Sequence, residues 1–138
     1  MTECKTHLIG IIRATRESLV QSSTDIAYAS DEVPLPRPAV EQMLRACVAI
    51  VEEGLVGESQ EVRAGFLEAL PDVARSSTWD ATLRGGLPCW GVLLGQLVAR
   101  AEPAHRAEAI TWLSTFMGAW WADVSKVMLP VLIAEKRL

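Results

Sequence analysis

The side chains best suited to acid–base or metal chemistry in this 138-residue chain are two histidines and three cysteines. Cys4 and His7 are three residues apart, as are His105 and Glu108, so each pair could share one face of a helix. A zinc site needs three or four ligands, and one pair supplies two. No nucleophile elbow, HExxH helix or phosphate-cradling glycine loop is present. We therefore predict no metal, no cofactor and no catalytic residue, and we interpret His105 as part of a solvated first helical turn.

The three cysteines, Cys4, Cys47 and Cys89, are odd in number and widely spaced. This spacing does not indicate a disulfide framework, so we expect buried, reduced thiols. The N-terminus shows no basic segment followed by an apolar run and a cleavage site. A cytoplasmic location is the resulting expectation.

Tryptophan is the abundant aromatic residue, with five copies against two phenylalanines and one tyrosine. Large amphipathic rings serve core packing, oligomer contacts and pockets for planar ligands. All three uses remain open, and the third defines a candidate binding site for a small apolar or aromatic ligand. Its predicted residues are Trp90, Trp112, Phe116 and Trp120. Trp120 and Trp121 are adjacent and cannot point the same way on a helix, so one ring should face the core and the other a partner or crevice.

Composition and charge favour one compact domain that binds neither nucleic acid nor membrane. Half of the residues are hydrophobic and 22% are charged, which is typical of a globular protein. A formal net charge of −4 with scattered basic residues argues against phosphate binding. A length of 138 residues suffices for one buried core.

The apolar stretch Leu83–Arg100 predicts a buried central helix. Two adjacent glycines followed by Pro88 favour a helix that begins near Leu87, and its length of about fifteen residues is too short to cross a bilayer. Gly91 and Gly95 lie four residues apart, so both could face one neighbouring helix at close range. We predict that they are helix-packing residues, that the last long helix packs there, and that Gly91→Leu destabilises the fold or changes its oligomeric state.

The first half of the chain predicts two amphipathic helices joined by an irregular connection. The first follows Thr2 as a cap, and its apolar stripe could dock inside the molecule or form a dimer seam. The connection, residues 21–38, is rich in serine and proline; a surface loop and a lid are both open, and the helix could persist as far as Tyr28. The second helix should run from Ala39 to Glu53 and stop at Gly54.

The second half predicts further helices. Ser59 can cap a helix that Pro71 kinks or interrupts, and a short helix should span Ser76 to Arg84. After a break at Pro103, apolar residues recur at spacings of three and four, and Pro130 should bend or end that long helix. No strand pattern appears. The expected fold is an all-α single-domain bundle of about six helices.

The sequence resembles the N-terminal helical domains of RsbR-type stressosome regulators and the related RsbRD-like modules. The resemblance rests on Tyr28, on a helix ending at Gly54, and on the run LRGGLPCWGVLLGQL. In that run the family's arginine, glycine and proline–leucine-like helix start correspond to Arg84, Gly86, Leu87 and Pro88. The resemblance implies a non-haem globin-like or helical-bundle sensor that dimerises and signals to an attached domain, although no output domain is recognisable here.

The expected function is therefore a regulatory or sensory helical module, a homodimer that binds a small molecule or a protein partner. The alternative is a stand-alone small-ligand binding protein with a tryptophan-lined pocket. An enzyme is less favoured because the inventory of catalytic side chains is thin. The run EVRAGFLEALPDVA resembles one helix of a HEAT repeat, but no second copy follows at a fixed period, which disfavours a solenoid scaffold.

Overall fold

The computed structural model describes residues 2–29, 34–75 and 79–135, with side chains described for 3–29, 34–75 and 86–135. These segments contain no strand, and they form five α-helices and one short 3-10 helix, so the predicted all-α fold is confirmed. The elements are α1 (Thr2–Tyr28), α2 (Arg37–Val56), α3 (Glu61–Arg75), α4 (Trp79–Arg100), η1 (Pro103–His105) and α5 (Arg106–Ala134).

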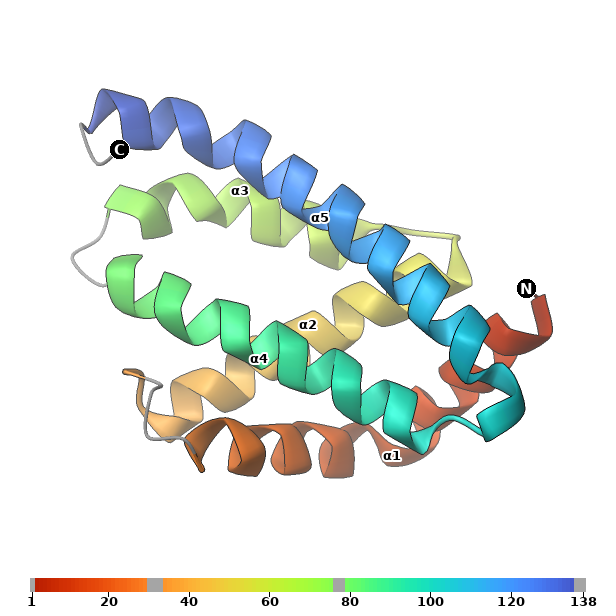
Figure 1. Cartoon of the computed structure of the whole chain (residues 1–138). Coiled ribbons are helices and arrows are strands. Elements are labelled where there is room, and N and C mark those ends of the chain that lie inside the picture. Colours follow the sequence, from red (N-terminus) through yellow and green to blue (C-terminus); the bar gives the residue numbers. More distant parts are fainter. Residues whose placement is uncertain (1, 30–33, 76–78, 136–138) are drawn as a thin grey trace.

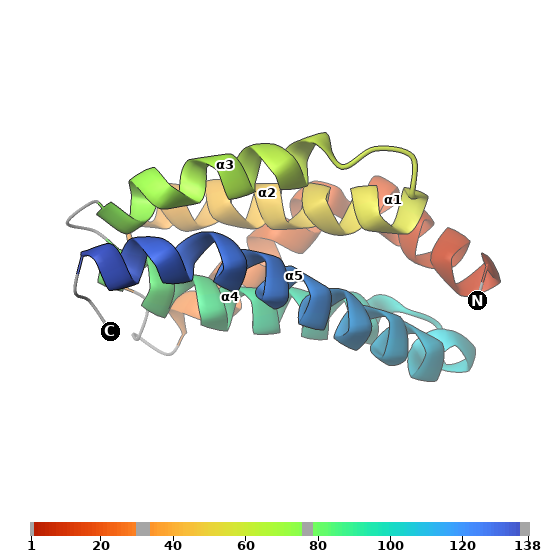
Figure 2. The ribbon, with the colours of Figure 1, turned by 90° about the horizontal axis from the view of Figure 1, so that it is seen from above.

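Successive helices run in opposite directions through the bundle (Figure 1). Helices α2 and α4 lie in the middle, α1 packs along both of them at one edge, and α3 packs along α5 at the other edge (Figures 1 and 2). Short connections between long helices favour this antiparallel arrangement. The η1 turn confirms the predicted break at Pro103 and reverses the chain between α4 and α5.

The irregular connection is shorter than predicted because α1 continues to Tyr28, as the sequence allowed, and α2 begins at Arg37. Residues 30–33 lie outside the description, so the choice between a loop and a lid stays a prediction. At its other end α2 passes through Gly54 and stops at Gly57, which has a left-handed φ of 77° and donates its N–H to the carbonyl of Glu53. Gly54 was therefore the wrong stop signal, because Gly57 supplies the left-handed residue that ends a helix.

Prolines do not interrupt the helices where the sequence suggested. Pro71 lies inside α3, Pro130 inside α5, and Pro88 ten residues into α4. Helix α4 thus begins at Trp79 rather than near Leu87, and the described part of the predicted 76–84 helix is its first turns; residues 76–78 lie outside the description. At Gly86 a Cβ would lie 3.7 Å from the Met43 sulfur of α2, so this turn of α4 packs against α2. We interpret this packing as the reason why the turn is helical although its glycines disfavour a helix.

Most of the apolar core is one cluster contributed by α1, α2, α4 and the first half of α5. A smaller cluster joins the ends of α3 and α5 and consists of Leu70, Ala74 and Met128. Partly buried Phe66, Leu67 and Val124 contact both clusters, so the two are continuous through the α3–α5 pair.

The segment Pro103–Ala134 is long and apolar enough to cross a membrane by length and composition. The central helix of a soluble protein passes the same test when it is mostly buried, but only 17% of the apolar window is buried here. Helix α5 therefore presents an unusually apolar outer surface.

Candidate functional site

Trp90 and Trp120 belong to the core, and neither is among the residues that line the pocket at Trp112. Trp120 is 1% exposed and Trp90 is 5% exposed, and their ring centroids are 5.8 Å apart. Phe66 of α3 contacts Trp120 from another side at 5.4 Å. The α3–α5 and α4–α5 contacts close over these two rings, so the Trp112 pocket is not lined by them, and their part in ligand binding stays a prediction. The neighbouring Trp121 is half-buried against the core.

Trp112 and Phe116, the other two predicted residues, do line a surface pocket of about 300 Å³. They lie one turn apart on α5, and their rings stack with centroids 5.1 Å apart and an interplanar angle of 17°. Phe116 is buried, whereas Trp112 is half-buried and forms the accessible wall. The rest of the lining comes from α2, α3 and the turn before α3, and from α5 itself: Gly54, Gln60, Arg63, Thr115 and Ala119.

Gly54 allows α5 to approach α2 at this pocket. A Cβ built on Gly54 would lie 2.7 Å from the Phe116 ring and 3.4 Å from Trp112. The first distance is far inside van der Waals contact, so the ring occupies the space that a side chain would need. From the sequence, Gly54 was interpreted only as a helix stop. Its neighbours are apolar residues of the same helix, and this was the missed signal for close packing on another helix.

Arg63 supplies the positive charge of the pocket. Its guanidinium lies 5.6 Å from the Phe116 ring centroid and 5.3 Å from that of Trp120, and it forms an ion pair with Asp123 of α5. Stacking of a guanidinium on aromatic faces is favourable, and the side chain is 12% exposed. Arg63 could have been found from the sequence, since it precedes Phe66 and Leu67 by three and four residues and therefore shares their inward face.

Gly91 and Gly95 are exposed, and no described helix packs closely over either position. A Cβ at either position would meet no atom within 4 Å, so the expected packing of α5 on these glycines is wrong. The helix turns Cys89, Trp90 and Leu93 inward, which leaves the opposite face, with Leu87 49% exposed, at the surface. The helix therefore has one buried face and one exposed face, and the prediction of a buried central helix holds for the first face only.

The Cys4–His7 pair and the His105–Glu108 pair, which are far apart in the sequence, lie at the same end of the bundle. The rings of His7 and His105 are 4.8 Å apart, and His7 Nε2 accepts the backbone N–H of Glu102 at 3.0 Å. Cys4 Sγ donates to the carbonyl of His105 at 3.6 Å. His105 is thus half-buried rather than solvated. Within residues 2–29, 34–75 and 79–135 no group of three His, Cys, Asp or Glu is arranged to hold a metal ion.

All three thiols are free and buried, as predicted. Burial raises the pKa of Cys47 and of Cys89 above the ordinary thiol value, and burial followed by the negative charge of Glu108 raises the pKa of Cys4. A raised pKa lowers the fraction of nucleophilic thiolate. These cysteines therefore have the properties of packing residues rather than of nucleophiles.

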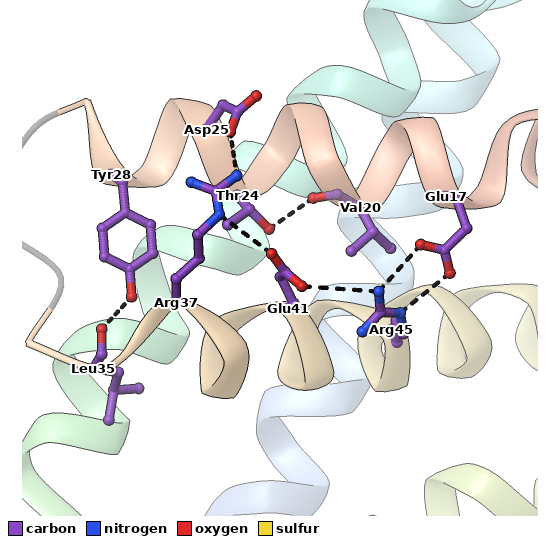
Figure 3. A network of polar contacts seen from close by, with 9 residues as sticks. All are labelled: Glu17, Val20, Thr24, Asp25, Tyr28, Leu35, Arg37, Glu41 and Arg45. Carbon is purple, nitrogen blue, oxygen red and sulfur yellow. Dashed lines mark hydrogen bonds and ion pairs between the residues drawn. The ribbon is translucent and has the colours of Figure 1, made fainter.

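Polar contacts between α1 and α2 form a chain along the surface (Figure 3). Arg45 contacts Glu17 and Glu41, and Arg37 contacts Glu41 and Asp25. The hydrogen bond from Arg45 is the main cause that lowers the pKa of Glu17. At the end of the chain the Tyr28 hydroxyl donates to the carbonyl of Leu35. Because the Arg45–Glu17 and Arg37–Asp25 ion pairs join the two helices, and Glu41 links the two arginines within α2, we interpret the network as a clamp that holds α1 to α2.

Comparison with models of protein families, with curated proteins and with solved structures finds no match. The function of the chain must therefore be inferred from its own geometry. The pocket at Trp112 brings aromatic side chains of α5 together with the Arg63 guanidinium and the Gln60 amide, from two stretches far apart in the sequence, residues 54–63 and 112–119.

Proposed function

We propose that this chain is a regulatory helical module that binds a small planar aromatic molecule at the Trp112 pocket and associates as a homodimer. Its resemblance to the N-terminal domains of RsbR-type regulators, globin-like sensors without haem, supports a sensory role. Three free thiols support a reducing compartment and hence the cytoplasm.

The observation that carries the proposal is the stacked Trp112–Phe116 pair at the wall of an open pocket. A volume of about 300 Å³ is at the lower end of the range for small-molecule sites. The Phe116 ring occupies the space beside Gly54 that a side chain would need, so it lies closely against α2. A wall that is fixed before binding loses little entropy when a ligand stacks on it.

The polar groups of the pocket select the ligand's charge. Arg63 is a cation, Gln60 contributes an amide, and none of the residues lining the pocket is acidic. Asp123 neutralises part of the Arg63 charge, and Lys5 lies 6.0 Å from the centroid of the Trp112 ring and adds a second positive charge nearby. An aromatic ring that carries a carboxylate or another acceptor fits this set better than an aromatic cation.

Three probes of matched size test the ligand class. Saturation-transfer NMR and calorimetry on the full chain would compare 2-naphthoate, 2-naphthylmethylammonium and decalin-2-carboxylate. We expect 2-naphthoate to bind best, because the cation loses the charge match and the saturated acid loses stacking. Equal binding of all three probes, or binding of none, would contradict the proposed ligand class.

A blocking variant with a matched control locates the site. Ala119 lines the pocket and Ala122 is exposed one turn further along α5, outside the lining. Ala119→Leu should weaken 2-naphthoate binding by about tenfold or more, and Ala122→Leu should leave it unchanged. Both positions are exposed, so both variants should melt like the parent chain. Equal loss in both variants would place binding elsewhere.

The alternative, a stand-alone ligand-binding protein, differs in one measurable respect. In a regulatory module the ligand must bind the two association states with different affinity, since otherwise it shifts no equilibrium. Light scattering with and without 2-naphthoate should therefore show a change in the dimer dissociation constant. Binding without such a change would favour the stand-alone reading.

A further inference from the structure

A second pocket, of about 500 Å³, lies on α1 beside the end of α4. Six residues of α1 between Thr6 and Thr15 form its walls, and Arg100 of α4 completes it. It shares no lining residue with the Trp112 pocket. We propose that this pocket binds a linear aliphatic carboxylate, whose charged group lies on Arg100 and whose chain follows the surface of α1. This site is additional to the aromatic site of the proposed function and does not depend on it.

Arg100 provides a cation whose protein partners are all uncharged. Its Nη2 donates to the Ser18 carbonyl at 3.4 Å, to the Ser18 hydroxyl at 3.2 Å and to the Ser22 hydroxyl at 3.1 Å. Among the described side chains Arg100 forms no ion pair, and its Nη1 makes no hydrogen bond. A carboxylate accepts a stronger, charge-assisted hydrogen bond from a guanidinium than a neutral oxygen does. Because none of the residues lining the pocket is acidic, an anion meets no repulsion there.

The middle of the pocket is small and apolar. Gly10 and Ala14 lie one turn apart and are exposed, and Ile11 beside them packs against the core. A Cβ at Gly10 would meet no atom within 4 Å, so the space over this turn is open. The stretch from Thr6 to Thr15 rises by about 14 Å along the helix. An extended methylene chain fits such a wall, and covering the wall removes apolar surface from water.

The two ends of the pocket are held by hydrogen bonds within the protein. Thr15 has non-helical φ and ψ of −128° and 21°, and its hydroxyl donates to the Ile11 carbonyl at 2.7 Å. Bonds of this kind bend a helix, and the two halves of α1 run in different directions (Figures 1 and 2). At the other end His7 Nε2 accepts the N–H of Glu102, which fixes the imidazole ring. Walls that are ordered before binding lose little entropy when a ligand arrives.

Three probes test the ligand class. Saturation-transfer NMR and calorimetry on the full chain would compare octanoate, propionate and octylammonium, each below the concentration at which it forms micelles. We expect octanoate to bind best. Propionate keeps the charge but loses buried methylene groups, each of which strengthens binding by up to about fourfold. Octylammonium keeps the chain but is repelled by Arg100. Equal binding of octanoate and octylammonium, or no binding of octanoate, would overturn the proposal.

A charge variant with a matched control tests the role of Arg100. Arg100→Gln should weaken octanoate binding by about tenfold or more, while the glutamine amide can still donate to the serine oxygens. Arg106 also lies at the end of α4, donates to the carbonyls of Ala99 and Ala101, and is outside the lining. Arg106→Gln removes the same charge and should leave octanoate binding unchanged. Equal weakening in both variants would show general attraction of anions and overturn the site.

A steric variant locates the chain of the ligand. Gly10→Leu should weaken octanoate binding by about tenfold or more without lowering the melting temperature, because no atom lies within 4 Å of the new Cβ. Gly91→Leu, at an exposed glycine of α4, is the control and should bind octanoate like the parent chain. Undiminished binding to Gly10→Leu would overturn the site.

The variant Ala119→Leu separates this proposal from the proposed function. It fills the Trp112 pocket, so it should weaken binding of 2-naphthoate and leave binding of octanoate unchanged. Loss of octanoate binding in Ala119→Leu would place octanoate in the Trp112 pocket and overturn the second site alone. Failure of 2-naphthoate to bind the parent chain would contradict the proposed function and leave the Arg100 pocket standing.

Discussion

At the scale of single residues, the glycines of this chain have opposite roles that the sequence does not distinguish. Gly54→Ala should lower the free energy of unfolding by about 1–3 kcal/mol, because its Cβ would lie 2.7 Å from the buried Phe116 ring. Gly91→Ala, at an exposed helical position, should raise it by about 0.5–1 kcal/mol through the loss of glycine's backbone freedom. Urea unfolding of both variants checks the pair, and a stabilising Gly54→Ala would show that α2 and α5 do not meet there.

The same comparison reverses the sequence prediction for Gly91→Leu, which should now be tolerated by the monomer. Spacing correctly indicated that Gly91 and Gly95 share a helix face, but spacing cannot say whether that face points into the bundle. The buried Cys89, Trp90 and Leu93 decide it, and they were equally visible in the sequence. The sequence of this helix does not look amphipathic, because its exposed face carries small residues such as Gly91 and Gly95 in place of polar ones.

Glu52 should make stability depend on pH. Burial alone would raise its pKa, but hydrogen bonds from Arg16 and Arg13 and their positive charges outweigh burial and lower it. A carboxyl whose folded pKa is lowered stabilises the fold above its unfolded pKa of about 4.3, and this contribution disappears as the pH falls through the folded pKa.

The corresponding variant is Glu52→Gln. At pH 7 it should lose about 0.5–1 kcal/mol of unfolding free energy, a small value because solvent screens the two arginines. The difference from the parent chain should shrink below about pH 4. The control is Glu58→Gln, which makes the same change at an exposed position of the α2–α3 turn. A gap between Glu52→Gln and the parent that is constant from pH 7 to pH 3 would contradict this role.

At the scale of elements, the start of α3 is fixed by a side chain of the preceding helix. The Glu53 carboxylate accepts the N–H groups of Val62 at 2.8 Å and Arg63 at 3.1 Å, whereas Ser59 accepts that of Glu61 at a longer 3.4 Å. Glu53→Gln should therefore cost about 1 kcal/mol and raise amide exchange at Val62 and Arg63 about fivefold. Ser59→Ala should have a smaller effect. If Ser59→Ala costs more than Glu53→Gln, Ser59 is the main cap of α3, as predicted from the sequence.

The elements show how far sequence reasoning extends here. Apolar periodicity found α1, α2, α3 and α5, since burial of one face fixes the helical repeat, whereas α4 was expected from an apolar run and was divided into two helices. The ends were harder: Pro88 and Pro130 argue for helix boundaries, yet both lie inside helices whose turns are held by neighbours. Only part of the pocket lining was predicted, because the rest depends on contacts between helices. Trp112 and Phe116 follow from residue type, but the lining contributed by Gly54 and Arg63 depends on how α2 and α3 meet α5.

At the scale of the molecule, the two core clusters imply unequal stability. The cluster shared by α3 and the end of α5 contains three buried residues, Leu70, Ala74 and Met128, and the main cluster draws on α1, α2, α4 and α5. Regions with few buried apolar contacts open at lower free energy than the global transition. Amides in the last two turns of α3 and of α5 should therefore exchange before those around Val48 of α2.

The variant Met128→Ala tests whether this end opens on its own. It removes buried volume only from the smaller cluster and should speed exchange at the ends of α3 and α5 more than at Val48. If both regions speed up equally, the bundle unfolds as one cooperative unit and the α3–α5 pair does not open by itself. If they separate, the paired ends of α3 and α5 open before the rest of the bundle, whereas the Trp112 pocket, whose Phe116 belongs to the main cluster, stays with the part that opens later.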